Sequence, residues 1–75
     1  MKLPPRIEAR PEVMAGKPCI KGTRIPVYLL LQKMAAGETT EDLLAVYPQL
    51  KLDDLRACLA YGAALAGEEV VLTEA

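Results

Sequence analysis

A chain of 75 residues has room for one domain, so we expect residues 1–75 to fold as a single unit around a small core. Charged residues make up 25% of it, which excludes simple disorder, and an aromatic content of 4% predicts an aliphatic core. The net charge of −1 argues against a dedicated nucleic-acid binder, although residues 1–33 are basic and the remainder is acidic.

The residue types present narrow the chemistry that the chain can support. The sequence lacks histidine, and Cys19 and Cys58 lie far apart without the spacing of a metal-binding motif. We therefore expect both thiols to be free and buried in a reducing cytoplasm. No apolar run approaches the ~20 residues of a membrane span, and residues 1–5 do not resemble a signal peptide. We expect a cytoplasmic protein without a metal, a cofactor or a membrane segment.

Residues 6–27 are predicted to form a small β-element with a basic loop. A short strand is expected over residues 6–10, with Ile7 and Ala9 on one face. Pro11 ends it, because proline cannot donate to a β-ladder.

Two further extended pieces are predicted before the first helix. Residues 15–18 have the composition of a turn. Residues 19–21 and 24–27 then flank a Gly-Thr pair, with Ile20 and Ile25 facing inward.

Three helices are predicted over residues 27–36, 40–47 and 52–66, and together they form the core segment 27–66. The first has apolar residues at helical spacing and ends before Gly37, which suits the C′ position. Its apolar positions are Val27, Leu30, Leu31, Met34 and Ala35.

The second and third helices carry start signals. Thr39 is placed to cap the second helix, with Asp42 at its third position, and Pro48 stops it. Asp53 and Asp54 lie in the first turn of the third helix, where carboxylates interact well with the helix dipole. The apolar positions of the third helix are Leu52, Leu55, Leu59, Gly62, Ala63 and Ala66.

Residues 68–75 form a C-terminal tail with an apolar run of Val70, Val71 and Leu72. This run is either a strand that completes the small sheet or a contact between two copies of the chain. A domain this small gains most by sharing its core, so we expect a homodimer with these three residues at the contact.

No part of the sequence indicates catalysis. Carboxylates stand at helix starts, where capping accounts for them, and the adjacent Asp53 and Asp54 point to different sides of their helix. Gly16 and Gly22 lack the context of a phosphate-binding loop. We therefore expect a protein that is not an enzyme.

The stretch before the first helix is the most distinctive part of the chain. Its basic side chains, Lys17, Lys21 and Arg24, suit an anion or an acidic partner. A purely structural interpretation is a turn-rich hairpin, in which Gly22 takes a positive φ and Thr23 bonds to nearby backbone. The two interpretations are compatible, because a rigid turn displays charge well.

The third helix is the other candidate surface. Its outer residues are Lys51, Asp53, Asp54, Arg56 and Ala60. A recognition helix would bring such residues to the base edges of DNA, but two carboxylates at the leading end repel phosphate. The alternative is an ordinary solvated helix face.

Residues 16–27 read GKPCIKGTRIPV, and residues 47–50 and 53–55 downstream read YPQL and DDL. This combination resembles the family numbered 433 among the domains of unknown function, over roughly residues 6–64. The motif residues that identify the resemblance most closely are Gly22, Thr23, Arg24 and Pro26.

The resemblance implies a mainly α fold, a three-helix homeodomain-like helix-turn-helix bundle with a short N-terminal β-element. Members are similar to antitoxins and are often paired with a PIN-like ribonuclease toxin. No catalytic residues carry over. Members often have Thr where this chain has Lys51, which cannot cap a helix, so we expect Asp53 or Asp54 to compensate or the helix to start nearby.

We therefore expect an antitoxin-type binding protein that neutralises a PIN-like nuclease by complementing its acidic metal site. The residues expected to bind the partner are Lys17, Lys21, Gly22, Thr23, Arg24 and Pro26. One alternative is a DNA-binding transcriptional regulator that uses Lys51 and Arg56. A second is a homodimeric assembly module with no nucleic-acid role.

Overall fold

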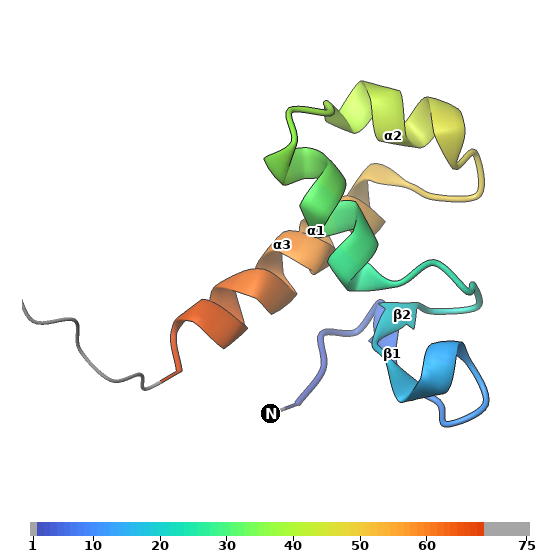
Figure 1. Cartoon of the computed structure of the whole chain (residues 1–75), viewed down its shortest axis with the longest axis vertical. Coiled ribbons are helices and arrows are strands. Elements are labelled where there is room, and N and C mark those ends of the chain that lie inside the picture. The colour runs from blue at the N-terminus through green and yellow to red at the C-terminus, as the bar shows by residue number, and fades with distance from the viewer. Residues whose placement is uncertain (1, 69–75) are drawn as a thin grey trace, which may run out of the picture.

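The computed structural model describes residues 2–68 and contains three helices and a small antiparallel sheet (Figure 1). The strands are β1 (Ile7–Glu8) and β2 (Cys19–Ile20), separated by a 3-10 turn, η1 (Met14–Gly16). The helices are α1 (Val27–Ala35), α2 (Thr40–Val46) and α3 (Leu52–Ala66). The predicted mainly helical fold with a short N-terminal β-element is confirmed.

β1 is shorter than the strand predicted over residues 6–10. Ile7 pairs with Ile20 and is buried, but Ala9 is exposed, so the placement of Ala9 on the inner face was wrong. Continued pairing would set Ala9 opposite Pro18, which has no N–H to donate. The carbonyl of Pro18 already accepts the N–H of Val27 at 2.9 Å. The β-ladder therefore ends at Glu8, because Pro18 cannot form the next pair.

The two extended pieces before α1 fold back on each other as predicted. Cys19 lies opposite Pro26 in an isolated bridge, and the N–H of Ile20 donates to the carbonyl of Ile25 at 3.0 Å. Both isoleucines are buried. The hairpin thus presents its apolar side to the helices.

α1 ends in a hydrogen-bonded Schellman motif. Gly37 has φ +99° at the C′ position, as predicted, a conformation that glycine adopts without steric cost. Its N–H donates to Met34 at 3.0 Å, and the N–H of Glu38 donates to Lys33 at 3.1 Å. The chain therefore reverses into α2 with the last carbonyls of α1 satisfied.

α2 begins with the predicted capping box. The N–H of Asp42 donates to the Thr39 hydroxyl at 3.1 Å, and the N–H of Thr39 donates to the Asp42 carboxylate at 3.0 Å. These two bonds with Thr39 hold the pKa of the Asp42 carboxyl below its usual value.

The core is aliphatic and lies where the three helices meet the sheet. Leu30, Leu43 and Leu55, one from each helix, are fully buried. α3 packs against both other helices. A β-carbon at Gly62 would lie 3.6 Å from Leu31, so α1 and α3 make close contact there. This contact sets the angle at which the second half of α3 extends from the body (Figure 1).

Within residues 2–68, no helix combines the length and the apolar character needed to cross a membrane. The C-terminal strand or dimer contact expected at Val70, Val71 and Leu72 lies outside the described residues.

Candidate functional site

The turn after β2 is held together from within. Gly22 has φ +78°, a left-handed conformation that side chains rarely adopt. The Thr23 hydroxyl donates to the carbonyl of Ile20 at 2.7 Å and accepts the N–H of Ile25 at 3.0 Å. The N–H of Gly22 donates to the Glu8 carboxylate at 3.1 Å, so an internal carboxylate occupies the donor of the turn.

Pro26 connects this turn to α1. It is buried, lies opposite Cys19 and precedes the first residue of the helix, where its missing N–H costs no hydrogen bond. Gly22, Thr23 and Pro26 therefore shape the turn, and two basic residues of the predicted partner-binding set, Lys21 and Arg24, lie in it.

The three cations of that set do not form one cluster. Lys17, Lys21 and Arg24 are all exposed. Lys21 and Arg24 lie at the closed end of the hairpin, whereas Lys17 lies at its open end, roughly 13 Å away along an extended chain. None of the three forms an ion pair with a described residue. Arg6, Arg10 and Arg56, in contrast, all do.

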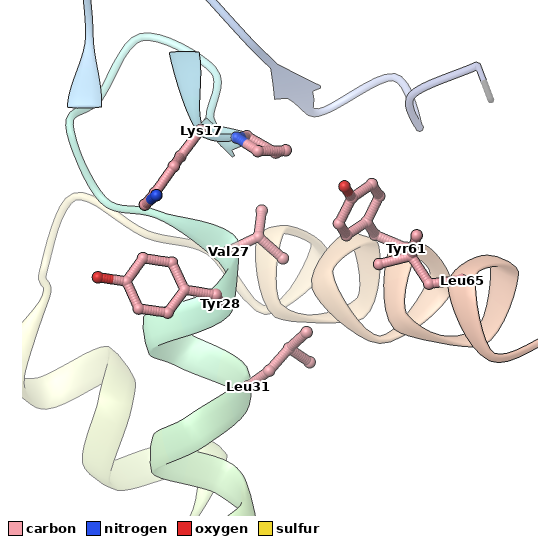
Figure 2. A pocket seen from close by; sticks show the side chains of 7 residues that line it. Lys17, Val27, Tyr28, Leu31, Tyr61 and Leu65 are labelled. Carbon is pink, nitrogen blue, oxygen red and sulfur yellow. The ribbon is translucent and has the colours of Figure 1, made fainter. Parts of the chain in front are cut away.

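A hollow of about 400 Å³ lies beside Lys17, between α1 and the second half of α3 (Figure 2). Its lining residues are Lys17, Pro18, Val27, Tyr28, Leu31, Tyr61 and Leu65. Lys17 and Tyr28 lie toward one end in Figure 2, and Tyr61 and Leu65 toward the other. Tyr28 is 46% exposed and Leu65 43% exposed. The hollow is thus an open, mainly apolar surface with one cation at its edge.

The carboxylates at the start of α3 bind to other residues of the same chain. Asp54 accepts the N–H of Lys51 at 2.8 Å, which is one half of a capping box. The N–H of Asp54 donates to the carbonyl of Lys51 at 2.9 Å, because the lysine side chain cannot accept it. The same carboxylate binds Arg6 at 3.1 Å, and Asp53 lies 3.6 Å from the second terminal nitrogen of Arg6. Asp54 therefore provides part of the compensation expected for Lys51, and α3 begins where predicted.

The two DNA-binding candidates differ in their surroundings. Arg56 lies 3.7 Å from Asp53, one turn earlier on the helix. Lys51 is exposed and forms no ion pair with the described residues. A phosphate that approached Arg56 would meet a carboxylate beside it.

The outer face of α3 is more apolar than a solvated face requires. Leu52 and Leu59 are 41% and 51% exposed, and Ala63 and Ala66 follow on the same face by helical spacing. Arg56 is the charged residue that interrupts this stripe. The stripe suits contact with protein better than contact with phosphate.

Both cysteines are buried and free, as expected. Burial, and secondarily the Asp54 carboxylate, raises the pKa of the Cys58 thiol to about 11. Burial also raises the pKa of Cys19. Over the part of the chain that the structure describes, no three cysteine or carboxylate side chains are grouped to hold a metal ion.

A comparison with known protein families matches the part of the chain that forms the hairpin and the helices. The family model described as "Protein of unknown function (DUF433)" matches residues 7–62, from the first strand into α3. The chain belongs to the DUF433 family. The match includes the hairpin turn, the capping box and the start of α3.

Two proteins are similar to this DUF433 chain. A crystal structure of a DUF433 member protein from Anabaena variabilis is 37% identical, with a TM-score of 0.76 over 79% of this chain and 58% of that chain. The uncharacterized protein y4eO of Sinorhizobium fredii is 33% identical over 58 residues, which are 77% of this chain and 26% of the relative. The chain therefore spans about a quarter of the curated relative and somewhat over half of the solved one.

Sequence reasoning missed the hollow and the role of Arg6. Tyr28 lies beside the predicted apolar stripe of α1, and Tyr61 and Leu65 stand one turn apart on α3. This spacing was a signal, but it did not show that the two helices face each other there. The ion pair of Arg6 with Asp54 joins residues 48 positions apart, for which the sequence has no local signal.

Proposed function

We propose that this DUF433 chain is a protein-binding module of the antitoxin type, without catalytic activity, that neutralises a PIN-like nuclease. One observation carries the proposal: Lys17, Lys21 and Arg24 are exposed and form no ion pair with a described residue. They belong to a hairpin whose turn is held by its own hydrogen bonds. A turn held by its own hydrogen bonds loses little backbone freedom on binding.

The chemistry of the expected partner supports this assignment. A nuclease of this type is expected to hold its metal with carboxylates, and such a site attracts lysine and arginine side chains. The resemblance of the family to antitoxins supports the same assignment.

The test begins with a tagged chain purified from its native cell at moderate salt, followed by mass spectrometry. We expect a stoichiometric PIN-like protein whose ribonuclease activity the wild-type chain inhibits. The variant K17A/K21A/R24A is expected to lose most of this inhibition, and K2A/K51A/R56A, which removes as many cations elsewhere, to retain it. Full inhibition by K17A/K21A/R24A would contradict the proposed contact.

The DNA-binding alternative draws on a different observation, the order α2, residues 47–51 and α3, which is that of a helix-turn-helix. Lys51 and Arg56 would then contact phosphate. In this case K2A/K51A/R56A, and not the hairpin variant, would change binding. Asp53 beside Arg56 and the apolar outer stripe of α3 make this the weaker candidate.

The assembly module rests on the exposed leucines of that same stripe, Leu52 and Leu59. It predicts a stable homodimer with neither a nuclease nor a DNA partner. Sedimentation equilibrium of the purified chain, alone and with the captured protein, separates this case from the antitoxin case.

A further inference from the structure

The hollow between α1 and α3 is a site that the nuclease contact does not by itself require. Tyr28 and Leu65 are each nearly half exposed, yet they converge with Val27, Leu31 and Tyr61 on one concave surface. Scattered apolar side chains on a surface are ordinary, but a concave convergent set marks a binding site. The volume of about 400 Å³ suits a short apolar segment better than a folded partner.

We propose that this hollow binds residues 70–72 of the same chain. The segment reads Val70-Val71-Leu72 and is the longest uninterrupted run of large aliphatic residues after α3. Burial of such a run against tyrosine and leucine side chains is the main source of favourable free energy available to it.

The length of the chain permits this docking without a second copy. Leu65, a wall of the hollow, stands just before the end of α3 at Ala66. Five extended residues after Gly67 reach roughly 16 Å. Leu65 and Tyr61 are only about 6 Å apart along the helix axis. A tail that turned back after Gly67 would therefore be long enough for residues 70–72 to reach both.

Charge complementarity favours the same occupant. Glu69 and Glu74 flank the apolar run. Lys17 stands at the edge of the hollow and forms no ion pair with the described residues. A docked tail brings carboxylates to this cation, which orients the segment even though an exposed pair adds little affinity.

The test is nuclear Overhauser spectroscopy on the full-length labelled protein. We expect cross-peaks between the ring protons of Tyr28 or Tyr61 and the methyl groups of residues 70–72, unchanged on tenfold dilution. The variant L65D is expected to abolish them, and L59D, an equally exposed leucine on another face of α3, to retain them.

A second variant keeps the test decisive if L65D fails to fold. V70S/V71S/L72S changes only the tail, so we expect it to shift the Tyr61 resonances and to lower Tm by roughly 5 °C. The control T73S is expected to change neither. Absence of the cross-peaks in the wild type, or unchanged Tyr61 resonances in the triple variant, would overturn the docking.

Mixing differently labelled copies identifies the source of the segment. Cross-peaks confined to a single copy support docking within the chain. Cross-peaks that appear only between copies would make the hollow a dimer contact and overturn the proposal. Cross-peaks from Tyr28 or Tyr61 to a co-purified nuclease, in place of those to residues 70–72, would also overturn the proposal, because the partner would then occupy the hollow. The docking can be tested separately from the nuclease contact, because its test needs no partner.

Discussion

Thr23 shows how one side chain can define the most distinctive stretch of this chain. Its hydroxyl bonds on both sides of the turn, to Ile20 and to Ile25, while Gly22 supplies the positive φ between them. The turn therefore owes its shape to hydrogen bonds and a backbone conformation within the chain itself. The specificity of the Gly-Thr-Arg-Ile-Pro sequence is in this sense structural, and the cations beside it are the part available for binding.

At this scale we expect Thr23→Val to cost about 1–2 kcal/mol of the free energy of unfolding. Valine keeps the shape of threonine but leaves the N–H of Ile25 without its acceptor. Thr40→Val, which removes a hydroxyl from an exposed position at the start of α2, is the control and is expected to stay within about 0.5 kcal/mol. Urea unfolding followed by circular dichroism measures both. Equal losses in the two variants would refute the role given to the Thr23 hydroxyl.

Cys58 makes stability depend on pH in the alkaline range. Because burial raises its pKa to about 11 from a model-compound value of 9.0, the unfolded chain loses the thiol proton first. Stability is therefore fully present below pH 9 and falls as pH rises toward 11, by about 2 kcal/mol from this group. Cys58→Ala is expected to be less stable at neutral pH but to fall less steeply over this range in urea titrations. An unchanged slope would contradict the assignment.

Between elements, the ion pairs of Arg6 join the N-terminal segment to the start of α3. Asp54 is buried and satisfies Lys51 and Arg6 together, whereas Asp53 is exposed. A buried carboxylate that accepts a backbone N–H at a helix start and binds an arginine is worth more than a surface pair, because its removal leaves both donors without their acceptor. Asp54 therefore adds a polar link between the N-terminal segment and α3 to the apolar contacts of the core.

Adjacent substitutions test this coupling. We expect Asp54→Asn to destabilise the protein by about 1–2 kcal/mol, since the amide cannot replace both acceptor bonds. Asp53→Asn removes the same charge one residue earlier and is expected to change stability by less than about 0.5 kcal/mol. Thermal unfolding of the two variants side by side gives the comparison. A larger loss in Asp53→Asn would reverse the ranking.

For the whole molecule, the distribution of charge separates two kinds of surface. The cations of the hairpin form no ion pair with a described residue. The carboxylates at the start of α3 already form ion pairs with arginines. The net charge is −1. Affinity for a polyanion needs several cations on one continuous face, whereas an acidic protein site needs only a few that are well placed.

We therefore expect weak binding of duplex DNA with little dependence on salt between about 50 and 200 mM. Fluorescence anisotropy with a labelled duplex, with and without Lys51→Ala and Arg56→Ala, measures this directly. Tight binding that falls steeply with salt and is lost in these variants would move the assignment from protein partner to DNA.

The sequence alone determined the features that depend on neighbours a few residues away. The start of α2, the bounds of α3, the capping box of Thr39 with Asp42 and the glycine stop at Gly37 were predicted and confirmed. Each involves hydrogen bonds or backbone preferences within about one helical turn, so the necessary residues are adjacent in the chain.

Only the tertiary structure decided what depends on residues brought together from a distance. It shortened β1 because the carbonyl of Pro18 bonds to Val27, and it separated Lys17 from the rest of the basic set. It also assembled the hollow from Tyr28 and Tyr61. These outcomes depend on how the helices and the hairpin pack, and the relative placement of elements is not encoded by the local preferences from which each element was predicted.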